Sequence, residues 1–302
     1  MAIFRLFSKA DKKPLPKSIS GWSEKFKKKD VEWLAVWLGG LLFIWLWLFF
    51  FLNSPARIKI ETAFFNTFVI AFLSTIMTLI LAWLHALVVY FSKRESPLLE
   101  QLSDIVISIW RALPQILGLL FGYILLVYLQ QDHQMSRPLV LFFLALTVAL
   151  VIFPELGDLL LERISYFQKS DFFDAMRVSG VRDGHIINYD ILYKNSRVHI
   201  LNKLIAIFGM TFFLLISVDF IVSVGLSRSV NLVNMPKTLG NVLAHIDSKQ
   251  DILAIGRVVT RPDLLFDLFF THLQGVSVAA IIVFSLFSLY KISLHFSRRL
   301  EM

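Results

Sequence analysis

The chain has 302 residues, of which 57% are hydrophobic and only 17% are charged. Soluble domains carry about 45–50% apolar and about 25% charged residues, so this composition excludes an ordinary soluble fold and predicts an all-α polytopic membrane protein. Because cysteine is absent, disulfides, thiolate metal sites and lipidated cysteines are excluded as well.

Six apolar segments are long enough to cross a bilayer, which requires about 20 mostly apolar residues. The proline at 114 is expected to kink the third segment or to start its crossing helix, and Arg111 is expected to extend to the inner headgroups. The predicted spans, in chain order, are 33–52, a stretch within 62–91, 105–130, 138–153, 204–226 and 268–290.

The placement of Lys and Arg predicts the orientation of these spans. With the N-terminus inside, the inner segments carry 21 Lys and Arg and the outer segments carry eight, so both termini are expected in the cytoplasm. The net charge of +8 therefore indicates membrane topology rather than a nucleic-acid partner. The expected divisions are a basic tail (1–32), a first helix with its outer loop (33–60), a transmembrane domain (61–295) and a C-terminal tail (296–302), with a long outer loop at 227–262.

The largest inner segment after the tail, residues 154–203, contains the stretch "SDFFDAMRVSG". Ser170 or Asp171 is a suitable N-cap, and Gly180 or Gly184 is a suitable stop, so a short helix with an apolar face is predicted. A second short helix is expected at about 185–193. Periodicity alone leaves two interpretations open, an amphipathic connector on the bilayer surface or a structured docking element.

The residues of this segment resemble a cytoplasmic motif of ATP-binding-cassette importer permeases. That motif runs E-A-A, three residues, glycine, nine residues and a stretch close to I-x-L-P. Here Asp174-Ala175-Met176 stands at the first element, Gly180 at the glycine and Asp190-Ile191-Leu192-Tyr193 at the closing stretch. The chain departs from the pattern by Asp for Glu, by Met for the second Ala, by Asp190 and by Tyr193 in place of proline.

Three further stretches resemble one branch of that family, the second permease subunit of dipeptide, oligopeptide and nickel importers. "SPLLEQLSDIVISIWRALPQILGLLFGYIL" (96–125) is similar to the branch's third span. "VDFIVSVGLS" (218–227) is similar to its E-A-x-L-S-F-L-G-L-G segment, with Asp219 at the acidic position and Ser223 at the serine. "MPKTLGNVLAHI" (235–246) is similar to the P-x-W-G-x-M-L that follows, with Leu239 in place of tryptophan.

The resemblance implies the type I importer permease fold, with six transmembrane helices and a coupling loop at about 170–195, in the bacterial inner membrane. It implies four partner chains, namely a second related permease, two cytoplasmic ATPases and an extracytoplasmic binding protein, besides membrane lipid. The chain itself is expected to be no enzyme and to bind no cofactor, because it lacks the GxxxxGK[ST] phosphate loop and ATP would be hydrolysed by the partners.

The resemblance assigns one set of residues to the contact with the ATPase, with the apolar members seated in a cleft and the charged members at its rim. These residues are Phe172, Phe173, Asp174, Ala175, Met176, Arg177, Gly180, Arg182, Asp183 and Leu192. Asp219 and Ser223 are the candidates for the substrate pathway, since an acid within a span is rare and functional by default. A structural hydrogen bond between helices is the alternative for Asp219.

Two other function classes stay open at this point. One is a secondary transporter or channel that works without an ATPase, and the other is a membrane scaffold subunit anchored through the basic tail. Short peptides are the expected cargo of a permease in this branch, and nickel, opines and sugars are alternatives.

Overall fold

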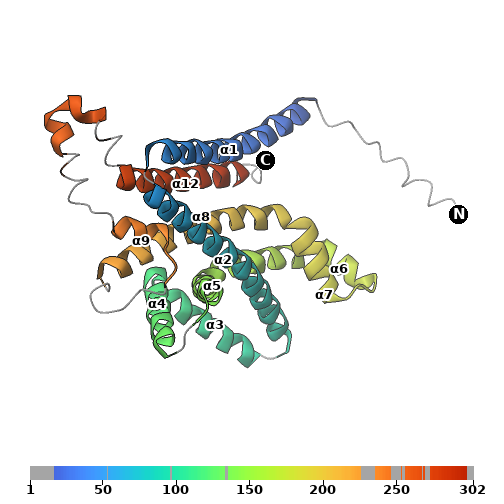
Figure 1. Cartoon of the computed structure of the whole chain (residues 1–302). Helices are drawn as coiled ribbons and strands as arrows, with labels where there is room; N and C mark the ends of the chain where they lie inside the picture. The colour runs from blue at the N-terminus through green and yellow to red at the C-terminus, as the bar shows by residue number, and fades with distance from the viewer. Residues whose placement is uncertain are drawn as a thin grey trace.

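The computed structural model describes residues 17–52, 54–95, 97–132, 135–225, 235–245, 253, 256–266, 268 and 273–297, and every regular element within them is helical (Figure 1). The long helices are α1 (Lys17–Phe51), α2 (Ser54–Glu95), α3 (Pro97–Ala112), α4 (Gln115–Asp132), α5 (Arg137–Gln168), α8 (Arg197–Gly225) and α12 (Leu273–Ser297). The short ones are α6 (Asp171–Val178), α7 (Asp183–His185), η3 (Ile186–Asn195), α9 (Leu239–Ala244) and η5 (Pro262–Leu264).

Five stretches in these helices are long and apolar enough to cross a membrane. They are Glu32–Phe50, Ser54–Ser92, Arg137–Gln168, Arg197–Val224 and Gly275–Leu294. An all-α, membrane-embedded protein is therefore confirmed. In the predicted basic tail, residues 17–32 continue as helix into the first span, whereas 1–16 lie outside the described residues, as do 298–302 of the C-terminal tail.

The third predicted span differs from the expected single helix. The chain breaks at Leu113 and Pro114, and only the shorter helix Gln115–Gln130 is apolar enough to compare with the other spans. Proline has no N–H to donate, and it disfavours the helical conformation of the residue before it, so α3 ends at Ala112. The expectation that a helix starts beside Pro114 is confirmed, but the expectation of a sixth span over 105–130 is not.

The centre of the bundle is the packing of α2 against α5. The buried face of α2 is rich in small residues, including Ser74, Ala82 and Ala86, which let the two helix backbones approach closely. On the other side of α5, Gly118 and Gly122 of α4 lie against the side chains of Val151 and Thr147. A Cβ at residue 122 would come within 1.9 Å of Thr147 Cγ2, so α4 and α5 need glycine there.

Helix α5 extends well beyond the predicted span 138–153 and ends only at Gln168. Its extra turns carry acidic side chains that pair with neighbouring helices. Asp158 pairs with Arg111 of α3, and Glu155 accepts hydrogen bonds from Gln115 Nε2 at 2.8 Å and from Lys203 Nζ of α8 at 3.0 Å. Arg111 therefore binds an acid on α5, and its extension to the lipid headgroups stays a prediction.

The two ends of the bundle carry different short elements. Figure 1 shows α6 and α7 at one end and α9 at the other, with α8 running between them. At about 1.5 Å per residue, the 29 residues of α8 separate these ends by about 40 Å. Along one side, α1 packs lengthwise on α12, where the ring of Phe284 fills the space beside Gly40.

Candidate functional site

Residues 169–196, which join α5 to α8, form the first candidate site and are called the α6 loop below. Helix α6 begins after Ser170, whose backbone is extended with φ −100° and ψ 148°, so the predicted helix start is confirmed. The Ser170 hydroxyl donates to the Phe167 carbonyl at 2.6 Å and does not cap α6. Asp171 and Asp174 lie in the first turn, where their negative charge complements the helix dipole.

Helix α6 ends at Val178, and Gly180, one of the two predicted stops, turns the chain away after it. Gly180 has a φ of +81°, a left-handed conformation that glycine adopts without a steric penalty from a Cβ. Its N–H donates to the Arg177 carbonyl at 2.9 Å, and the Val181 N–H donates to the Met176 carbonyl at 3.1 Å. This pair of bonds is a Schellman motif, which fixes the direction of the chain after the helix.

The second half of the α6 loop is α7 followed by the π-helix η3. Four apolar side chains of η3, Ile186, Ile187, Ile191 and Leu192, have no solvent exposure and join the core beneath the α6 loop. Leu192 therefore packs in the core of this protein and is not available for the predicted contact with an ATPase. Interior residues of a π-helix use their backbone N–H groups, which proline lacks, so tyrosine at 193 suits this helix better than the proline of the family pattern.

Two of the three apolar residues expected to enter a partner's cleft face this protein's own core. Phe173 is 4% exposed and packs in the main hydrophobic cluster, and Met176 packs partly buried against the same cluster. Phe172, the third, is 37% exposed and lies edge-on to the ring of Phe167. The expectation that Phe173 and Met176 face a partner does not fit this packing.

Two of the charged residues expected at a partner's rim form an ion pair with each other. Arg177 Nε lies 3.2 Å from Asp183 Oδ1, which ties the end of α6 to the start of α7. The Tyr90 hydroxyl of α2 donates to Asp183 Oδ2 at 3.4 Å, and Trp83 Nε1, also of α2, donates to Asn188 Oδ1 at 2.7 Å. These contacts hold the α6 loop to the central helix α2.

The exposed face of the α6 loop combines apolar, aromatic and charged side chains. The predicted residues that are exposed there are Phe172, Asp174, Ala175, Arg177, Gly180 and Arg182. The sequence prediction missed Val178, which is 89% exposed, and a ring stack that runs from His185 through Tyr189 to Tyr193. The spacing of these three rings at i, i+4 and i+8 in the sequence could have predicted that they lie along one face of a helix.

The second candidate site surrounds Asp219 and Ser223 at the opposite end of α8. Asp219 is 6% exposed, and its carboxylate faces the Tyr123 hydroxyl of α4 and the backbone N–H of Asn241. Neither Asp219 Oδ2 nor the Tyr123 hydroxyl has a hydrogen-bond partner of normal geometry within the described ranges. Ser223, which is also buried, accepts a hydrogen bond from Asn241 Nδ2 at 3.0 Å.

Residues 235–245 close over Asp219 and are called the α9 segment below. Asn66 Nδ2 of α2 donates to the Lys237 carbonyl at 2.7 Å, and the Leu239 N–H donates to Thr67 Oγ1 at 3.0 Å. Gly240 packs so closely on α8 that a Cβ would lie 2.3 Å from the Ile216 carbonyl oxygen. The predicted loop 227–262 thus contains the short helix α9, although the segments 226–234, 246–252 and 254–255 lie outside the described residues.

The two candidate sites are therefore separate, one at each end of α8. The α6 loop presents a surface fixed from beneath by buried anchors, and the Asp219 cluster is closed by the α9 segment. Comparison of the chain with protein-family models, with curated proteins and with solved structures gave no match.

Proposed function

We infer that the chain is the membrane permease subunit of an ATP-driven importer, which takes up peptides or a related small solute. Two cytoplasmic ATPases, a second permease and an extracytoplasmic binding protein would complete the transporter. The observation that carries this proposal is the construction of the α6 loop, which is folded as a capped, anchored unit with a mixed apolar and charged exposed face. The order and spacing of the motif residues from Asp174 to Tyr193 support it independently.

The anchoring of the α6 loop suits the transmission of force. A connector that only rests on lipid needs neither buried isoleucines nor hydrogen bonds to another helix, but the α6 loop has both. The loop also joins α5 directly to α8. A partner that pulls on α6 would therefore move both helices as one body, and domain rocking of this kind is how transporters change access.

The contact with the ATPase is assigned to the exposed side chains of the α6 loop. Phe172 and Val178 supply apolar contact, while Asp174 and Arg182 supply charges at the rim. The stacked rings of Tyr189 and Tyr193 extend the surface along η3. ATP is hydrolysed by the partner, and this chain holds no cofactor in the proposal.

Asp219 is assigned to a link between helices in the closed conformation. Its burial beneath Gly240 and beside Asn241 keeps a substrate away from the carboxylate while the α9 segment stays in place. Asp219 and Ser223 would meet a substrate, such as one with a cationic amine, only after the α9 segment moves away from α8.

Asp174→Arg is expected to separate the permease from its ATPase without unfolding it, because Asp174 is exposed and the reversed charge faces the partner. We expect the ATPase activity that co-purifies with the detergent-solubilised protein to fall about tenfold, as for loss of a single 1.4 kcal/mol contact. Asp263→Arg, which reverses an exposed acid in η5, is the matched control and should retain that activity. If the wild-type protein purifies without any ATPase and still moves solute, an ATPase-independent transporter is the correct function.

A further inference from the structure

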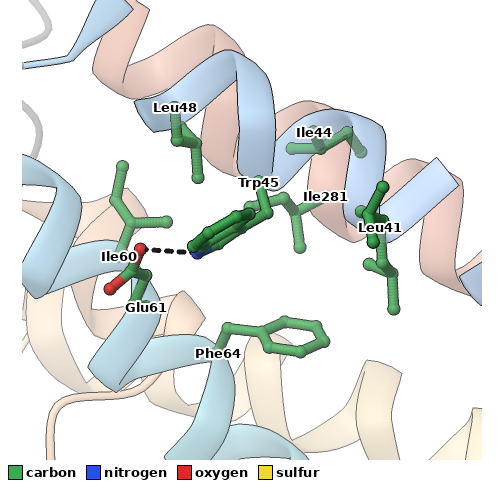
Figure 2. A pocket seen from close by; sticks show the side chains of 9 residues that line it. Leu41, Ile44, Trp45, Leu48, Ile60, Glu61, Phe64 and Ile281 are labelled. Carbon is green, nitrogen blue, oxygen red and sulfur yellow. Dashed lines mark hydrogen bonds between the residues drawn. The ribbon is translucent and has the colours of Figure 1, made fainter. Parts of the chain in front are cut away.

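Helices α1 and α2 enclose an apolar groove that no part of the proposed transport mechanism uses. Helix α1 lies along α12 but contacts α2 much less, and the space left between them has a volume of about 280 Å³. Figure 2 shows the side chains that surround it, with the indole of Trp45 reaching from α1 toward Glu61 of α2. The lining residues are Leu41, Leu42, Ile44, Trp45, Leu48, Ile60, Glu61, Phe64 and Ile281.

The groove opens to the side of the bundle that faces lipid. Leu42 and Trp45, which line it, are exposed, as are Ile58 and Phe65 on the adjoining surface of α2. In a bilayer, the molecules next to such a groove are lipids, so an acyl chain is available to occupy it. The side chains that line an empty groove would lack dispersion contacts on that side. An acyl chain that enters the groove supplies those contacts, which favours its binding.

Charged side chains stand at one end of the groove, close to the turn between α1 and α2. Glu61 accepts a hydrogen bond from Trp45 Nε1 at 2.8 Å, and Arg57 Nε lies 3.8 Å from the same carboxylate oxygen. Counted from Ser54 at about 1.5 Å per residue, Glu61 lies about 10 Å along α2 from the turn. A turn located among the headgroups would therefore bring Glu61 near the start of the hydrocarbon.

We propose that this groove is a binding site for one phospholipid with an ammonium headgroup, such as phosphatidylethanolamine. One acyl chain occupies the apolar groove, the phosphate binds Arg57, and the ammonium group binds Glu61. The order of the charges matches such a headgroup, which carries both an anion and a cation. Phosphatidylglycerol has the phosphate but no ammonium group, so it leaves Glu61 without a cationic partner in the headgroup.

The test measures which lipid the purified protein retains. The protein is delipidated in detergent, mixed with equal amounts of phosphatidylethanolamine and phosphatidylglycerol, and examined by native mass spectrometry. We expect one retained phosphatidylethanolamine with about a fivefold preference, as for a partly exposed ion pair. Glu61→Gln should keep the hydrogen bond from Trp45 but remove that preference, while retaining a lipid.

A pair of tryptophan variants tests the groove itself. Ile44→Trp should fill the groove and lower lipid retention severalfold, whereas Leu46→Trp adds the same bulk to an exposed position of α1 outside the lining and should retain lipid as the wild type does. Equal retention of the two lipids by the wild type, or unchanged retention in Ile44→Trp, would overturn the proposal. Loss of a co-purifying membrane protein from Ile44→Trp, with lipid unchanged, would instead assign the groove to a partner helix.

Discussion

Replacing Phe173 with alanine is expected to lower the free energy of unfolding by about 3–5 kcal/mol, the usual cost of removing a buried phenylalanine ring. Phe173 is 4% exposed and packs in the cluster that also holds Ile187 and Ile191. The vacancy would loosen α6 from α5 and η3. Hydrogen exchange of the α6 loop should therefore become faster, and the midpoint of thermal unfolding in detergent should fall.

The neighbouring Phe172→Ala is the matched control for this prediction. Phe172 is 37% exposed, so its truncation should change the free energy of unfolding by less than about 1 kcal/mol, as for a surface position. It should nonetheless weaken the association with the proposed ATPase partner, since the ring belongs to the exposed face. Equal destabilisation by the two variants would contradict the assignment of one ring to the core and the other to the partner.

Gly240→Ala is expected to displace the α9 segment from α8. The new Cβ would lie 2.3 Å from the Ile216 carbonyl oxygen and 3.0 Å from the Phe220 nitrogen. Both are backbone atoms that a rotamer change cannot move, so the overpacking should cost about 1–3 kcal/mol. The natural absence of cysteine allows a direct measurement, because Leu239→Cys places one thiol at a position with no solvent exposure.

Maleimide should label that thiol slowly in the single variant and faster once Gly240→Ala is added. Gly39→Ala serves as the control, since a Cβ there meets nothing within 4 Å and alanine favours the helix. Gly39→Ala should leave the labelling rate of Leu239→Cys unchanged. Unchanged labelling with Gly240→Ala would show that the α9 segment does not depend on this close contact.

Much of the fold could be predicted because lipid imposes one dominant constraint. A backbone inside hydrocarbon must satisfy its own hydrogen bonds, so long apolar stretches form helices. Composition does not mark where such a helix ends, however. Helix α5 continues to Gln168 because Glu155 and Asp158 find partners on neighbouring helices, and those partners are distant in the sequence. At Pro114 the break follows from chemistry of the proline itself, and the sequence indicated it.

The α6 loop shows the same limit at the level of single residues. The start and the stop of α6 are local features, so Ser170 and Gly180 could be identified from the residues themselves. The sequence of a short amphipathic helix does not predict which of its aromatic side chains is buried in the core. Phe172 and Phe173 are adjacent and chemically identical, and only the packing of η3 and α5 determines which ring is buried. The pairing of Arg177 with Asp183 depends on the turn between them in the same way.

The Asp219 cluster was identified by one signal, an acid within an apolar span. Its surroundings depend on the return of the α9 segment onto α2 and α8, which a one-dimensional pattern does not describe. Thr67 illustrates this point, because its hydroxyl looks like an ordinary polar residue in a span but accepts the Leu239 N–H from a segment far along the chain.

Cysteine cross-linking can determine whether the α6 loop docks an ATPase, as we propose. The test variant is Val178→Cys, at an 89% exposed position of the α6 loop. The control is Val259→Cys, at a 79% exposed position beyond the α9 segment. Native membranes that contain either variant are treated with a thiol-to-amine cross-linker. Our account predicts a product from Val178→Cys alone whose partner is labelled by azido-ATP, with a yield that changes when ATP is added. No ATP-labelled product from Val178→Cys, or equal products from both positions, would contradict it.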